Sequence, residues 1–187
     1  TNFRDPARMD PGARSRGHLV VEALQTADPL GWSAELAARV DEYNPFNLLF
    51  SAQGELFALQ SEGGAPGPVA AGVHALSNHL LDTPWPKVTA ARERLAQALG
   101  DTLDPPALVE LLHDERPAPD AALPQTGVPQ EWERLLSSCF IRAPGYGTRS
   151  TSVVLMGHDG RCRFVEQTWD ADGAPAGRVD QAFSITA

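Results

Sequence analysis

A tight turn that presents a single arginine is the most informative feature of this chain. Residues 145–147 read Gly-Tyr-Gly, and Arg149 follows at the start of a β-branched run that is typical of a strand. A guanidinium is always charged and carries a rigid fork of donors, so an arginine beside such a turn can be aimed at an anion in a cleft. The alternative is a hairpin with a surface arginine that pairs with an acid such as Glu166 or Asp170.

A second segment has a similar character. Residues 72–87 carry an apolar run that ends in polar side chains ahead of a predicted helix, and Asn78 lies in the middle of them. A side-chain amide can donate hydrogen bonds to an oxygen that becomes negatively charged during acyl transfer. The alternative is that Asn78 caps a turn or the following helix, because Asp82 and Thr83 also precede the Pro-Trp-Pro entry.

Composition and charge restrict the function further. The 187 residues, 42% hydrophobic and 21% charged, are ordinary for one globular domain, and the net charge of −9 argues against a nucleic-acid partner. No run in the sequence reaches 18 apolar residues, so no membrane span is predicted. The two cysteines, Cys139 and Cys162, do not show the spacing of a metal site, and the histidines do not show it either. The sequence therefore predicts no cofactor and no metal. Two reduced thiols would suit a cytoplasmic protein.

Periodicity and turn signals predict an α+β fold with antiparallel strands. The first helix is expected to bury Leu19, Val20, Ala23 and Leu24 on one face. Residues 114–130 are rich in proline and are expected to form a surface loop. Further helices are predicted after Asp28, over 86–99 and over 105–113, and strands over 46–50, 55–59, 69–78, 138–142, 150–157, 162–169 and 178–185.

Several motifs occur together in one order along the chain. They are Thr1-Asn2-Phe3-Arg4-Asp5-Pro6, Ser15-Arg16-Gly17, Phe46-Asn47-Leu48-Leu49, Leu76-Ser77-Asn78 through Pro84-Trp85-Pro86-Lys87, and Gly145-Tyr146-Gly147-Thr148-Arg149-Ser150. Several motifs in one order are hard to obtain by chance. This order resembles a known family, the NRDE-motif proteins, which include the transport and Golgi organisation protein of eukaryotes and its bacterial homologues. The resemblance covers essentially the whole chain.

The resemblance implies a fold like that of the N-terminal nucleophile (Ntn) hydrolases, an αββα sandwich of two antiparallel sheets flanked by helices. Family members begin Met-Cys and carry an Asn-Arg-Asp-Glu motif before the Thr-Asn segment that opens this chain. By this resemblance residues 1–187 form a single NRDE/Ntn-hydrolase-like domain whose N-terminal strands are missing. Such a domain would expose sheet edges, so an accompanying N-terminal piece or a homo-oligomer is expected.

The same resemblance implies roles for three residues. Asn78 and Asn2 would donate hydrogen bonds to the oxyanion, and Arg149 would lie beside the nucleophile or bind a substrate carboxylate. The substrate would be a small amide or acyl compound. The nucleophilic cysteine would lie in the missing segment, so the 187-residue chain alone is predicted to be inactive. Thr1 is a weaker alternative nucleophile, because Pro6 interrupts the strand that normally follows such a residue.

A non-enzymatic function is the second hypothesis. In this alternative the same cleft would bind haem, a lipid or an acyl-coenzyme A, or would serve secretory organisation, without forming a covalent adduct. The chain has no Cys-x-x-Cys-His motif for covalent haem attachment. A thioester on a leading cysteine would distinguish the enzyme from the carrier.

Overall fold

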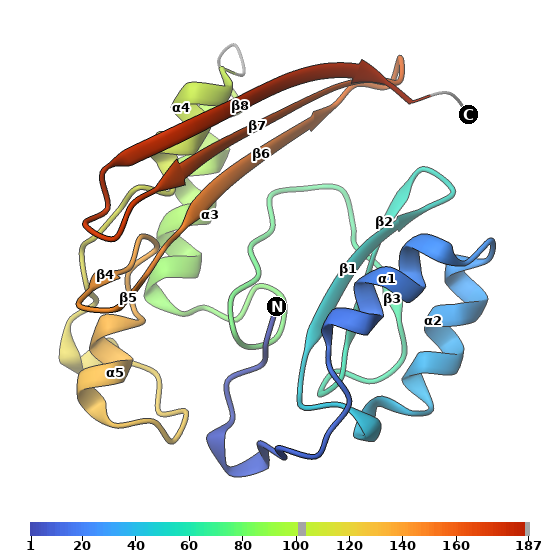
Figure 1. The fold of residues 1–187 in the computed structure, drawn as a ribbon, viewed down its shortest axis with the longest axis horizontal. Coiled ribbons are helices and arrows are strands. Elements are labelled where there is room, and N and C mark those ends of the chain that lie inside the picture. Colours follow the sequence, from blue (N-terminus) through green and yellow to red (C-terminus); the bar gives the residue numbers. More distant parts are fainter. Residues whose placement is uncertain (101–103, 186–187) are drawn as a thin grey trace. The chain divides into compact units, whose positions relative to one another are not determined.

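The computed structural model describes residues 1–100 and 104–185 and shows an α+β fold with antiparallel sheets, which confirms the predicted fold class (Figure 1). The chain divides into two compact units. The first unit contains Thr1–Pro84 and Gln125–Val128, and the second contains Trp85–Pro124 and Pro129–Ala187. A single functional domain over 1–187 stays a prediction.

The first unit is built around an antiparallel sheet in the order β1-β2-β3. The predicted hairpin forms, because Gln53 and Gly54 both adopt a positive φ, 53° and 80°, as a two-residue turn of this hand requires. The strand predicted over 69–78 is wrong: the third strand has only two residues, and the chain after it is an irregular loop. The elements are η1 (Pro6–Arg8), α1 (Gly17–Gln25), α2 (Pro29–Ala37), η2 (Val40–Glu42), β1 (Asn47–Ala52), β2 (Glu55–Gln60) and β3 (Gly67–Pro68).

The core of this unit lies where α1 and α2 pack on β1 and β2 (Figure 1). The predicted inner face of α1 is only partly correct, since Leu19 is buried whereas Val20 and Leu24 are 53% and 81% exposed. Glu22 lies on the packed face instead, because its carboxylate accepts hydrogen bonds from Trp32 Nε1 and the Arg39 guanidinium. The buried residues of the core are Leu19, Leu36, Tyr43, Phe46 and Leu59.

The start of α2 offers a test of local stability. The Asp28 carboxylate accepts a hydrogen bond from Gly31 N–H at 3.0 Å, and Pro29 occupies the first helical position. Asp28→Ala leaves that N–H without its acceptor, so we expect the free energy of unfolding to fall by about 1 kcal/mol. Urea unfolding followed by circular dichroism measures the change. Asp41→Ala, which removes an exposed acid of η2, is the control and should leave the midpoint unchanged.

The second unit contains a longer antiparallel sheet in the order β6-β7-β8, as the sequence predicts. The strand predicted over 138–142 is wrong, because a turn occupies 136–140 and only a two-residue ribbon strand follows. Helix α5 was not predicted. The elements are α3 (Pro86–Ala98), α4 (Pro105–Leu111), η3 (Asp120–Ala122), α5 (Gln130–Leu135), β4 (Arg142–Ala143), β5 (Tyr146–Gly147), β6 (Ser150–Met156), β7 (Arg161–Trp169) and β8 (Pro175–Ser184).

An aromatic cluster forms the core of the second unit, beside α4. The Phe140 and Trp169 rings meet edge to face with centroids 5.1 Å apart, and the His113 ring lies 4.2 Å from Phe140. Val109 and Val165 complete the buried set. Residues 114–129 pass through the proline-rich stretch with only the short η3, so most of this stretch has no regular secondary structure.

Candidate functional site

Residues 1–3 are held against the start of β1 by backbone hydrogen bonds. Thr1 N–H donates to Asn47 O at 2.6 Å, and Asn47 N–H donates to Thr1 O at 2.8 Å. Phe3 N–H donates to Pro45 O at 3.0 Å, and Asn2 forms an antiparallel bridge with Phe46. Because this pairing is that of adjacent antiparallel strands, the backbone of Asn2 has a defined position.

The loop that carries Asn78 is closed by Asp82. Asp82 Oδ1 accepts a hydrogen bond from Ala75 N–H at 2.9 Å, and Asp82 N–H donates to Ala75 O at the same distance. His74 joins the closure, with Nδ1 2.6 Å from Asp82 Oδ2 and Nε2 2.9 Å from Ala70 O. Asp82 has a φ of 58°, which costs backbone energy for a non-glycine residue and is compensated here by these contacts.

Asn2 and Asn78 meet in the first unit although they are 76 positions apart. Asn78 Nδ2 donates to Asn2 O at 3.0 Å, and Arg4 N–H donates to Asn78 O at 2.8 Å. The Arg4 guanidinium lies 3.5 Å from Asn78 Oδ1, and the Thr1 hydroxyl donates to Ser77 O at 2.8 Å. These contacts fix the orientation of the Asn78 amide, with its NH₂ group toward Asn2.

The Asn78 amide therefore keeps one donor for a ligand. An NH₂ group has two hydrogens, and the hydrogen bond to Asn2 O uses one of them. No acceptor in the described ranges 1–100 and 104–185 takes the second hydrogen. The helix-cap alternative is not what forms, since α3 has Trp85 at its N-cap position without a side-chain hydrogen bond. Asn78 can instead serve as a positioned donor to a ligand oxygen.

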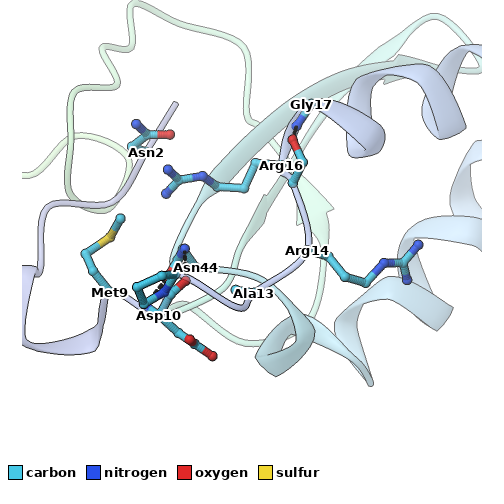
Figure 2. A pocket seen from close by; sticks show the side chains of 10 residues that line it. Asn2, Met9, Asp10, Ala13, Arg14, Arg16, Gly17 and Asn44 are labelled. Carbon is cyan, nitrogen blue, oxygen red and sulfur yellow. Dashed lines mark hydrogen bonds between the residues drawn. The ribbon is translucent and has the colours of Figure 1, made fainter.

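An open pocket of about 460 Å³ lies beside Asn2 (Figure 2). The Arg16 guanidinium extends toward Asn2, whereas the Arg14 side chain points away from both (Figure 2). Arg16 donates to Pro45 O at 3.0 Å, and Arg14 forms an ion pair with Glu42 at 2.7 Å. The pocket is lined by Asn2, Met9, Asp10, Pro11, Ala13, Arg14, Ser15, Arg16, Gly17 and Asn44.

Arg149 belongs to the second unit, where the predicted turn forms. Arg142 pairs with Gly147 and Ala143 with Tyr146 across that turn, and Gly145 has a φ of 72°. A Cβ on Gly147 would lie only 2.6 Å from the Ile141 carbonyl oxygen, so glycine is required there.

The side chain of Arg149 is exposed and contacts a carbonyl rather than a carboxylate. Its Nη1 donates to the backbone oxygen of Asp170 at 2.7 Å, and Trp169 N–H donates to Arg149 O. The predicted ion-pair alternative with the Asp170 carboxylate is therefore not the contact observed. The prediction that Arg149 completes a site with Asn2 and Asn78 stays a prediction.

The cysteines of the chain are free but do not resemble nucleophiles. Burial raises the pKa of the Cys139 thiol, although Arg94 and Lys87 act in the opposite direction. Cys162 is buried in β7. A protonated thiol reacts slowly, so Cys139 is not suited to covalent catalysis at neutral pH, and the buried Cys162 thiol is not accessible to a substrate. Within residues 1–100 and 104–185 no group of three His, Cys, Asp or Glu side chains could hold a metal ion.

No helix in the described portion of the chain is both long and apolar enough to cross a membrane.

Sequence reasoning missed Arg4 and Arg16 as neighbours of the predicted site. The Ser15-Arg16-Gly17 motif was a usable signal, because an arginine next to a glycine at a helix start is a residue type suited to anion binding.

Comparison with known proteins shows which family model and which relatives this chain matches. The family model described as Transport and Golgi organisation 2 matches residues 1–171. A Bos taurus protein named Transport and Golgi organization protein 2 homolog is 33% identical over 186 residues, and its Homo sapiens counterpart is 32% identical over 185 residues. A Mus musculus homologue is 29% identical over 186 residues. Each match covers 90% of this chain and 66%, just under two thirds, of the relative.

Proposed function

Because this chain belongs to the Transport and Golgi organisation 2 family, whose model matches residues 1–171, we propose that Asn2 and Asn78 form the oxyanion site of an Ntn-type amidohydrolase. The substrate class is a small acylated amine, and the bond that breaks is its amide C–N bond. The contact between Asn78 Nδ2 and Asn2 O is the observation that supports this proposal most directly.

The chemistry assigns a separate task to each group. In this proposal a cysteine thiolate from outside the 187 residues attacks the carbonyl carbon, and the C=O electron pair moves onto oxygen. The remaining Asn78 N–H and the Asn2 side-chain amide donate to that oxyanion. The C–N bond breaks as the amine takes up the proton that the thiol gave to the α-amino group of the cysteine, and water then hydrolyses the thioester to the free acid and the thiol.

Binding of a tetrahedral analogue tests the oxyanion site without any nucleophile. The probes are N-hexanoylglycine methyl ester and the phosphonamidate in which a tetrahedral phosphorus replaces its amide carbonyl carbon. We expect the 187-residue chain to bind the phosphonamidate about 100-fold more tightly, because an oxyanion site is complementary to the tetrahedral state. Asn78→Asp keeps the shape but replaces the donor by a carboxylate, which cannot donate and repels the anionic phosphorus group, so it should reduce this preference by about 100-fold or more. Isothermal titration calorimetry measures both affinities.

Ser77→Ala is the matched control for this experiment. The Ser77 side chain is adjacent in sequence, yet only its backbone oxygen takes part in the contacts around Asn2. This variant should therefore keep the full preference for the phosphonamidate. Equal affinity of the unchanged chain for both probes, or an undiminished preference in Asn78→Asp, would contradict the oxyanion assignment.

A second candidate function is non-enzymatic binding or trafficking, with haem, a lipid or an acyl-coenzyme A as cargo. The names of the mammalian relatives refer to transport and Golgi organisation. The open pocket beside Asn2, with Met9, Pro11 and Ala13 as apolar lining, favours a binding role. A carrier would bind the planar ester as tightly as the tetrahedral probe. We propose the cytoplasm as the compartment, which two free thiols support.

A further inference from the structure

We propose that the pocket beside Asn2 recognises a carboxylate of the ligand through the guanidinium of Arg16. The proposed substrate class then becomes narrower: a small amide that also carries a carboxylate, such as an N-acyl amino acid. This inference rests on the proposed function only for the amide part of the ligand, since recognition of the carboxylate by Arg16 requires no catalysis.

The charge of Arg16 is not neutralised by the protein. Arg14, two residues earlier, forms ion pairs with Glu42 at 2.7 Å and Glu22 at 3.4 Å. Arg39 likewise pairs with Glu22 at 3.1 Å. In the ranges 1–100 and 104–185 no carboxylate pairs with Arg16, whose hydrogen bond goes to the neutral Pro45 carbonyl. A half-buried guanidinium without an acid is a strong candidate for binding an external anion.

The position of the guanidinium is also fixed. Its Nη1 donates to the oxygen of Pro45, a buried residue next to the bridge that holds Asn2. One anchored nitrogen leaves the other N–H groups of the fork free to bind a carboxylate by two hydrogen bonds. The Asn2 side-chain amide has no partner within the described parts of the chain and faces the same guanidinium (Figure 2).

The acid in the pocket does not compete for this position. Asp10 Oδ1 accepts a hydrogen bond from Gly12 N–H at 2.8 Å, and its carboxylate points away from Arg16 (Figure 2). The backbone of Asp10 is held by Asn44 through N–H to Oδ1 at 2.6 Å and Nδ2 to O at 2.9 Å. Since the whole chain carries a net charge of −9, a bound anion needs a local cation, and Arg16 supplies it.

The size and lining of the pocket suit a small molecule with an apolar part. A volume of about 460 Å³ is in the range of small-ligand sites. Met9, Pro11 and Ala13 supply apolar surface beside the polar end formed by Arg16 and Asn2. In this arrangement the acyl chain of the ligand lies against the apolar surface, and the carboxylate of its amino-acid part binds the guanidinium.

Calorimetric titration with N-hexanoylglycine and with its uncharged methyl ester tests this inference on the 187-residue chain. We expect the acid to bind about 10-fold to 100-fold more tightly than the ester, because a bidentate charge-assisted pair is lost with the ester. Arg16→Gln should bring the two affinities to the same value. Arg16→Lys keeps the charge but not the fork, so it should keep part of the preference. Arg8→Gln, which changes the net charge equally outside the pocket, should keep all of it.

Two outcomes would overturn the inference: equal affinity for acid and ester in the unchanged chain, or a preference that survives in Arg16→Gln. Circular dichroism of each variant shows whether the fold is retained, and Arg16→Lys provides a second reading if Arg16→Gln does not fold. The phosphonamidate carries no carboxylate but is itself an anion, so its comparison with the ester is also made in Arg16→Gln. A preference for the phosphonamidate that survives in Arg16→Gln and is lost in Asn78→Asp belongs to the oxyanion site, so the two assignments succeed or fail separately.

Discussion

Asp114→Asn is expected to lower the free energy of unfolding of the second unit by about 3 kcal/mol, since it leaves a half-buried arginine without its counter-charge. The Asp114 side chain is only 15% exposed and forms ion pairs with Arg94 and with Arg116. The Arg94 Nε is buried without a hydrogen-bond partner in the described structure, so this guanidinium depends on Asp114 for compensation. Urea unfolding followed by tryptophan fluorescence measures the loss.

The same pair predicts a pH dependence with a definite sign. Hydrogen bonds from Arg116, together with those from Arg94, hold the pKa of Asp114 far below its ordinary value of 3.8. The unfolded chain therefore takes up this proton first as the pH falls, and acid favours the unfolded state. The stabilisation is complete above pH 5 or so and is lost progressively below the ordinary pKa. The unfolding free energies of the unchanged chain and of Asp114→Asn should converge there.

Asp120→Asn provides the matched control. Asp120 accepts two hydrogen bonds from Arg134, at 2.9 and 2.6 Å, but this pair is exposed to solvent. An exposed ion pair contributes little, because water and salt screen it. Equal losses for Asp114→Asn and Asp120→Asn would show that burial of the Arg94 pair does not matter.

Phe140→Ala is expected to have a comparable effect of about 3 to 5 kcal/mol, through a cavity in the aromatic core. Phe140 is 1% exposed and contacts the rings of Trp169 and His113. Its N–H also donates to Asp114 O at 2.9 Å, so the backbone around it is fixed and cannot collapse into the space. Thermal unfolding of the variant, with the midpoint and enthalpy recorded, measures the loss.

Phe183→Ala removes the same ring from β8, where Phe183 is 49% exposed. Because little apolar surface leaves water at that position, the expected change is a small fraction of the Phe140 effect. A loss at Phe183 as large as that at Phe140 would indicate that the face of β8 is covered in solution by a partner. The two variants therefore distinguish core packing from an interface.

Sequence patterns predicted the elements whose signals are local. The Gln53-Gly54 hairpin, the helix after Asp28 and the strands of the β6-β7-β8 sheet follow from turn chemistry, caps and alternation. The strand predicted over 69–78 failed because its backbone is organised by side chains: Asp82 and His74 close a loop instead of a ladder. The prediction of the buried face of α1 was partly wrong because Glu22 occupies a packed position, where it is held by its hydrogen bonds to Trp32 and Arg39.

The candidate site was predictable in part. The family resemblance singled out Asn2 and Asn78, and the structure brings them into contact, while the roles assigned to them stay predictions. The pocket next to them could not be predicted, since its lining combines residues 9–17 with Asn44 through backbone contacts that leave no periodic signal. Whether an arginine is neutralised also depends on three-dimensional neighbours, which is why Arg14 and Arg16 look equivalent in the sequence and differ in the structure.

The contact between Asn2 and Asn78 can form only after both residues have been synthesised. During translation the first of these residues is made long before the second, because 76 positions separate them. A nascent chain therefore acquires its ligand-binding surface only after most of the first unit has left the ribosome. Contacts this distant in sequence close late in folding, since loop entropy must first be overcome. A ligand that requires both residues binds only the completed fold, so it stabilises completed chains relative to partly folded ones.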